Sequence, residues 1–243
     1  MTYKQARIFI DIETSANPEA CAFMPEPIIE APGNYKDPEK IAAYIVEKTE
    51  AAKASALDKA ALDADYGQIL SIGFGRFDGQ DREITIVYVV GEIWKTEELE
   101  NEDGTIYLHE EYLTETSLLE YFWKNFQKVN GNCIGYNILG FDLPYILRRS
   151  MALGVKVPVI PNLAKFRTEP VTDLMAILYN WGSDRYKGLK QVCKIYGIPN
   201  SCPDFDGSMV KNMTSNQLRE YQESDIKLTM ALYQRMNGIY FNH

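Results

Sequence analysis

Apolar residues cluster in three short stretches in the first third of the chain. Residues 7–13, 68–77 and 83–90 each have the length and composition of a buried strand. The last two stretches flank Asp78 and Gly79, a pair of residues typical of a turn. This pattern predicts that the chain opens with strands of a mixed sheet.

Beyond residue 110 the apolar positions recur with the helical period. The clearest of these helical runs, residues 214–236, begins with a capping box of Thr214 and Gln217. A short strand at residues 133–137 follows the first helical run, residues 114–128, and implies a β-α-β crossover. The predicted helices are 114–128, 144–153, 173–179, 186–196 and 214–236, and glycine follows several of them as a stop signal.

A long segment, residues 17–67, separates the first two predicted strands. It is rich in proline at its start, and from Pro38 to about Asp63 it is rich in alanine, lysine and glutamate. We expect one exposed helix there, either a plain solvated element or a clamp for substrate or a partner. A chain of 243 residues suits one domain, 1–243, that carries this insertion.

Composition and charge limit the cellular location, the cysteine chemistry and the binding partners that we expect. The chain has no apolar run of 18 residues and no signal-peptide pattern, so we expect a cytoplasmic protein without membrane association. Its four cysteines lack CxxC spacing, which predicts free thiols. The net charge of −9 argues against a nucleic-acid partner. Residues 143–194, however, hold nine basic side chains against three acidic ones, either a solvated surface or a phosphate-binding one.

Two carboxylates share one face of the first predicted strand. The period of two places Phe9, Asp11 and Glu13 on that face, with isoleucines on the other. Two like charges about 4 Å apart repel by about 4 kcal/mol at an effective dielectric near 20. A divalent cation between them is the simplest explanation, and the alternative is that both acids mark a frayed strand end.

A third carboxylate lies on the inward stripe of the final helix. Asp225 stands in the middle of that stripe, and Tyr221 precedes it by one turn. A core-facing carboxylate must be paired, hydrogen-bonded or bound to metal. A structural aspartate beside a core tyrosine is the alternative. The stripe consists of Leu218, Tyr221, Asp225, Leu228 and Leu232.

Asp142 is the fourth acid, between a predicted strand and a predicted helix, where it serves as a helix cap or as a metal ligand. The two histidines, His109 and His243, lie outside all of these segments. Histidine-based zinc sites and Ser-His triads therefore have little support. Carboxylate ligands favour hard cations such as Mg²⁺ or Mn²⁺.

These residues resemble the motifs of the DEDD exonuclease superfamily in its tyrosine variant, specifically the proofreading exonuclease domain of family B DNA polymerases. Asp11 and Glu13 match the DxE motif, residues 137–142 match Nx3FD, and residues 221–225 match YxxxD. Residues 187–199 are similar to the helix before the third motif. The resemblance implies an α/β, ribonuclease H-like mixed sheet flanked by helices, from which the insertion at 17–67 departs.

The resemblance also implies an activity, a 3′-5′ exonuclease that hydrolyses DNA, above all single-stranded DNA, to nucleoside monophosphates with two divalent cations. Asp11, Glu13 and Asp225 would bind the metal that activates water, and Asp11 would bridge to a second metal near Asp142. Tyr221 would orient the water.

For substrate, the resemblance assigns Asn137 and Phe141 to the pocket of the terminal nucleotide. Lys187 and Lys190, with Lys194 on roughly the same helix face, are expected along the strand path. Asp173 is expected to cap a helix rather than to serve as an extra acid of the site.

Only about one helix follows the third motif, so we expect a stand-alone, phage-type nuclease that works beside replication or recombination proteins. The alternatives are an exoribonuclease of the same superfamily and a non-catalytic nucleic-acid-binding protein on this fold.

Overall fold

The computed structural model describes residues 6–78, 82–100 and 106–241. The chain divides into two compact units. The sheet unit comprises Met1–Glu13 and Ile69–His243, and the insertion unit comprises Thr14–Gln68.

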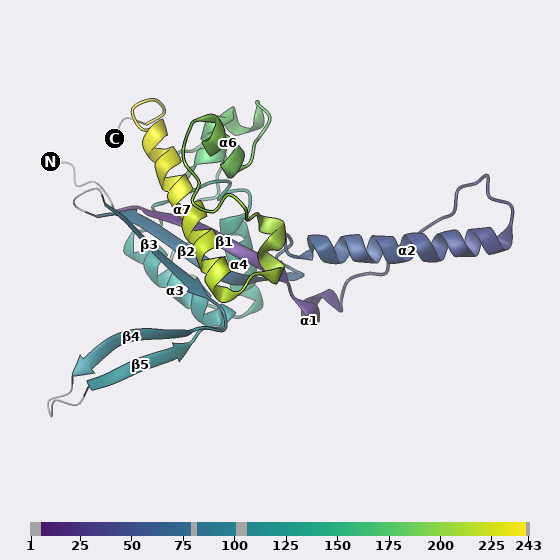
Figure 1. Ribbon diagram of the computed structural model, residues 1–243, viewed down its shortest axis with the longest axis horizontal. Coiled ribbons are helices and arrows are strands. Elements are labelled where there is room, and N and C mark those ends of the chain that lie inside the picture. Colours follow the sequence, from purple (N-terminus) through teal and green to yellow (C-terminus); the bar gives the residue numbers. More distant parts are fainter. Residues whose placement is uncertain (1–5, 79–81, 101–105, 242–243) are drawn as a thin grey trace. The chain divides into compact units, whose positions relative to one another are not determined.

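A five-stranded mixed sheet organises the sheet unit (Figure 1). The strand order is β3-β2-β1-β6-β7. β2 pairs antiparallel with β3, whereas β6 runs parallel to both β1 and β7. The three strands expected near the start of the chain and the crossover strand are thereby confirmed. The strands are β1 (Ile8–Ala16), β2 (Gly67–Phe77), β3 (Glu83–Val89), β6 (Cys133–Gly135) and β7 (Val171–Asp173).

Helices cover both faces of this sheet (Figure 1). On one face the ring of Phe74 stacks on Phe122 of α3, with centroids 6.2 Å apart. On the other face the glycines of β2 lie against α7, whose Ile226 is fully buried. The α/β class is therefore confirmed. The helices are α3 (Glu115–Lys128), α4 (Asp142–Ala152), α5 (Leu174–Leu178), α6 (Leu189–Ile195) and α7 (Ser215–Met236), with short 3-10 turns η1 (Asn180–Gly182) and η2 (Gly207–Asn212).

Two helix starts differ from the expectation. α4 begins at Asp142, two residues before the predicted Pro144. α6 begins at Leu189 because Gly188 has an extended backbone, with φ −68° and ψ 153°. Lys187 therefore precedes the helix. The expectation that Lys187 shares one helix face with Lys190 and Lys194 is wrong, because only Lys190 and Lys194 lie on α6.

An antiparallel hairpin was not expected from the sequence. It consists of β4 (Ile93–Glu100) and β5 (Ile106–Tyr112) and forms a separate two-stranded sheet. Charged residues are so frequent in this stretch that no apolar alternation stands out. The pairing of the two strands identifies the hairpin.

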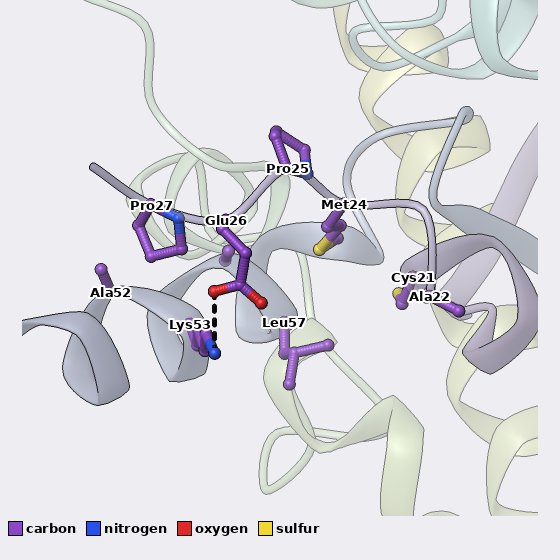
Figure 2. A pocket seen from close by; sticks show the side chains of 10 residues that line it. Cys21, Ala22, Met24, Pro25, Glu26, Pro27, Ala52, Lys53 and Leu57 are labelled. Atoms are coloured by element: carbon purple, nitrogen blue, oxygen red, sulfur yellow. Dashed lines mark ion pairs between the residues drawn. The ribbon is translucent and has the colours of Figure 1, made fainter. Parts of the chain in front are cut away.

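The insertion unit contains α1 (Pro18–Cys21) and the predicted helix α2 (Pro38–Ala60), of which only Ala60 is buried. At the base of the unit the Asn17 N–H donates to the Tyr66 carbonyl at 2.8 Å. A pocket of about 240 Å³ lies between residues 21–27 and α2, and an ion pair of Lys53 and Glu26 at 2.8 Å stands at its wall (Figure 2).

All four cysteines are free thiols, as predicted. Among the described residues, no helix has the length and apolarity needed to cross a membrane.

Candidate active site

Asp11 and Glu13 lie on β1, whose neighbours are β2 and β6. Burial raises the pKa of both carboxyls well above the usual value. The charge of Glu13, followed by the charges of Asp142 and Asp225, raises the pKa of Asp11 further. The four acids of three chain-distant segments therefore lie close enough to repel one another.

Asp142 reaches from the start of α4 to the first motif. Its Oδ1 accepts the backbone N–H of Ile12 at 3.1 Å. Burial raises its pKa to about 7, although the N–H groups of Asp142 itself and of Ile12 oppose the shift. Phe141, not Asp142, occupies the cap position of α4, so the helix-cap interpretation of Asp142 is wrong. The carboxylate instead joins α4 to β1.

Glycines in β2 let α7 approach the strand that carries the first two acids. A Cβ placed on Gly75 would lie 2.6 Å from Ile226 Cγ2 and 2.7 Å from Met230 Sδ. Gln222 uses this proximity, because its Nε2 donates to the Asp11 carbonyl at 2.8 Å. The polar bond fixes α7 against β1 at the height of Asp11.

Tyr221 and Asp225 project from α7 toward the same acids. Tyr221 is buried, and it lies close enough to the Asp225 carboxyl to lower the pKa of that group. Burial, followed by the charges of Glu13 and Asp225, raises the tyrosine pKa far above its usual value. Tyr221 is thus neutral at physiological pH and acts as a hydrogen-bonding group, not as a base.

A lysine lies beside two of the four carboxylates, Glu13 and Asp225. Lys190 Nζ is 3.7 Å from Asp225 Oδ1, a distance that makes an ion pair but no hydrogen bond, and 4.1 Å from the centroid of the Tyr221 ring. It also donates to the Phe205 carbonyl. Its charge lowers the pKa of Glu13 and of Asp225, against the larger effect of burial. The sequence pattern placed Lys190 on a strand path, and no spacing signal pointed to the carboxylates.

Two carboxylate oxygens of this cluster are unsatisfied. Asp11 Oδ2 and Asp225 Oδ1 are buried without a hydrogen-bond partner among the described residues. Buried polar atoms rarely lack a partner, and unsatisfied carboxylate oxygens are what a hard cation such as Mg²⁺ or Mn²⁺ takes as ligands. Within the described ranges no three acidic, histidine or cysteine side chains are already arranged as a metal site.

The side chain of Asp173 holds the loop of the second motif, residues 137–142, in place. Its carboxylate accepts the backbone N–H of Asn137 at 3.1 Å and that of Leu139 at 3.0 Å. It also accepts the N–H of Ala176, so the predicted helix-cap role is confirmed. The bonds to the loop are a second role that sequence reasoning missed. Asn137 has a φ of 65°, a left-handed conformation that asparagine tolerates better than most residues.

The remaining expected substrate residues lie around this loop. The Phe141 ring is half-buried and contacts the Tyr145 ring, with centroids 5.3 Å apart. Lys187 is anchored on two aromatic residues, because its carbonyl accepts the Tyr136 hydroxyl and its Nζ lies 4.8 Å over the Tyr179 ring. The structure therefore brings Lys190 to the acids and leaves Lys187 outside them.

Comparison with known proteins gives the fold a context. The sequence model of a family described as "Predicted 3'-5' exonuclease related to the exonuclease domain of PolB" matches residues 81–240. Among solved structures, the family B DNA polymerase from the hyperthermophilic archaeon Pyrobaculum calidifontis is similar, with a TM-score of 0.54 and 16% identity over 96% of this chain. This chain spans 24% of that polymerase. The likeness confirms the ribonuclease H-like fold. No curated protein matches the sequence.

Proposed function

Because the chain belongs to the family of predicted 3′-5′ exonucleases related to the exonuclease domain of PolB, we propose that it hydrolyses single-stranded DNA from the 3′ end to nucleoside monophosphates. Asp11, Glu13, Asp142 and Asp225 hold two divalent cations, Mg²⁺ or Mn²⁺, in this proposal. The observation that carries it is a pair of buried oxygens without a hydrogen-bond partner among the described residues, one on Asp11 and one on Asp225, on elements that are far apart in sequence.

Bound divalent cations supply a water of lowered pKa and neutralise charge on the oxygens at phosphorus. The side chains of the chain do the rest. Tyr221, neutral and beside Asp225, orients the attacking water. Lys190 offers a positive charge beside the acids, where a phosphate oxygen becomes more negative in the transition state. Asp142 keeps the second motif joined to β1 while it contributes to the metal site.

The net charge of −9 does not oppose a DNA substrate. Two divalent cations bring four positive charges to the place where acids are densest. Residues 143–194, with their excess of basic side chains, supply the surface that a phosphate backbone needs. Asn137 and Phe141 shape the pocket of the terminal nucleotide, beside Asp142.

The test uses matched DNA and RNA oligonucleotides, each labelled at the 5′ end, with Mg²⁺, Mn²⁺ or excess EDTA. We expect a ladder of single-nucleotide steps on DNA with either metal, no product in EDTA, and protection by a blocked 3′ end. The Asp11→Asn variant is the matched inactive control. Cutting of circular single strands, or hydrolysis in EDTA, would contradict the proposal. Faster hydrolysis of RNA would favour the exoribonuclease alternative.

A further inference from the structure

Two aromatic side chains from different loops of the sheet unit meet outside the carboxylate cluster. The rings of Phe166 and Trp181 have centroids 5.4 Å apart and planes tilted by 51°. Phe166 is 74% exposed, and Trp181, in η1, is half-buried. Large aromatic rings are among the side chains that gain most from burial, so an exposed pair is a surface available to another flat, apolar group.

The backbone holds this pair in a conformation that bulky residues avoid. Phe166 has a φ of 63° and Trp181 a φ of 56°. The other non-glycine residues with positive φ in the described ranges are all asparagines, which tolerate that region. One of them, Asn180, with a φ of 45°, directly precedes Trp181. Strain of this kind persists where the surrounding structure fixes it, and it is concentrated at ligand-binding positions.

The surroundings of the pair are positively charged. Lys165 and Arg167 flank Phe166 and are exposed, and Arg185 follows Trp181. Nearby acids offset this charge only in part. Glu169 is bound to Arg7 at 2.6 Å, Asp173 is buried under backbone N–H groups, and Asp184 is exposed.

Contacts and short stretches of sequence connect the carboxylates with the pair. Lys190, at Asp225, lies three residues after Lys187, whose Nζ lies over the Tyr179 ring. The Tyr179 ring in turn meets the Tyr186 ring, with centroids 6.0 Å apart. Trp181 follows Tyr179 by two residues in η1. Two lysines and two tyrosine rings therefore lie on the segments that lead from the proposed site of hydrolysis to the pair.

We propose that Phe166 and Trp181 form a platform on which a base of the single-stranded substrate stacks, several nucleotides to the 5′ side of the reacting 3′ end. Exposed aromatic rings combined with cations along the backbone path are the features by which proteins hold single strands without reading their sequence. Bases in the interior of a duplex are already stacked on both faces and do not offer a free one. This inference rests on the proposed function and adds a subsite for the single strand to it.

The test measures binding of oligo(dT) to the full chain with Ca²⁺ in place of Mg²⁺, by fluorescence anisotropy of a 5′ label. We expect Phe166→Ala and Trp181→Ala to raise the Kd for a 20-mer about tenfold to a hundredfold each. A trimer should bind equally to all variants, because it is too short to span the pair and the acids. Phe166→Tyr should keep the wild-type affinity, whereas Phe166→Leu should lose it.

The matched control is Ile160→Ala, which removes another exposed apolar side chain, 81% exposed, within the same basic stretch. It should leave both affinities unchanged. If wild-type protein binds the 20-mer and the Phe166 and Trp181 variants bind it equally well, the platform is wrong and the exonuclease proposal survives. If wild-type protein neither binds nor hydrolyses DNA, the proposed function itself fails. Equal losses on blunt duplex DNA would overturn the single-strand assignment.

Discussion

The backbone N–H of Asn137 donates to Asp173 Oδ1 at 3.1 Å, so the second motif rests on an acid 36 residues further along the chain. Asp173→Asn places an NH₂ group where Asp173 Oδ2 accepts the Leu139 N–H. Leaving a buried donor unsatisfied costs about 1–3 kcal/mol. We expect stability to fall by that amount and single-turnover hydrolysis to slow about tenfold or more.

Asp37→Asn is the control for this change, since Asp37 caps α2 by accepting the Glu39 N–H at 3.0 Å, in the insertion unit. It should alter hydrolysis little. If Asp173→Asn lowers the unfolding free energy but hydrolyses DNA at the wild-type rate, Asp173 only caps α5.

In the proposed function the four acids bind metal through their negative charge. Asp11→Asn and Asp225→Asn should each lower turnover by at least ~10³-fold, because a neutral amide is a poor ligand for a hard cation. Both variants should remain folded, and without metal each should resist thermal unfolding better than wild type at pH 8, since one like charge has left the cluster. Circular dichroism melts and rates in Mn²⁺ check both statements. A strong loss of metal-free stability would assign the two carboxylates to structure.

Metal-free stability should depend on pH in a defined direction. The pKa of Asp142 is about 7 in the folded chain against the usual 3.8, and those of Asp11 and Glu13 are also raised. A raised acid pKa means that the folded state binds protons more tightly than the unfolded state does. For Asp142 the stability gained from this is fully present below about pH 4 and is lost as the pH rises from there through about 7.

Melting temperatures in EDTA should therefore be higher at pH 5.5 than at pH 8, and Asp142→Asn, which keeps an oxygen for Ile12, should flatten this difference. Added Mn²⁺ should stabilise the protein more at pH 8, where protons no longer compete for the ligands. A melting temperature unaffected by millimolar Mn²⁺ at pH 8 would speak against the metal site.

Removing the Tyr221 hydroxyl tests water orientation alone. Tyr221→Phe keeps the ring under Lys190 and should slow single-turnover hydrolysis by roughly tenfold to a thousandfold, about 1.4 to 4 kcal/mol of barrier, with unchanged Mn²⁺ affinity. Tyr233→Phe, on the same helix, removes a hydroxyl that accepts from Arg7 and should leave the rate unchanged. A wild-type rate for Tyr221→Phe would make Tyr221 a core residue only.

The contact between α7 and β2 sets the position of Asp225. Gly75→Ala adds a methyl group 2.6 Å from Ile226 Cγ2, so the helix must shift. We expect a loss of about 1–3 kcal/mol in unfolding free energy, together with a fall in activity. Gly33→Ala, where nothing lies within 4 Å of the added carbon, is the matched control. Full activity in a destabilised Gly75→Ala would show that the acids tolerate a displaced helix.

What could be predicted from the sequence follows from periodicity. Alternation along β1 gave the shared face of Asp11 and Glu13, and the helical stripe gave Tyr221 and Asp225 a common direction. Contacts between segments that are distant in sequence produce no periodic pattern in the sequence. The bond from Ile12 to Asp142 and the approach of Lys190 to Asp225 depend on how the elements pack.

The same reason explains the loop contacts of Asp173, which local spacing identifies only as a cap. The hairpin β4–β5 was not predicted for a different reason. Its many charged residues hide the alternation of apolar and polar residues that marks a half-buried strand.

The Asn17–Tyr66 hydrogen bond at the base of the insertion has an evolutionary consequence. β1 and β2 are neighbours in the sheet, so the chain leaves one strand and re-enters the next at adjacent ends. The insertion connects these two ends, a connection that a tight turn could also make. A lineage can lengthen, trade or discard such a segment without shifting the register of any strand, and loop closure penalises added length only slowly. The insertion is therefore the part of this enzyme best suited to diversification.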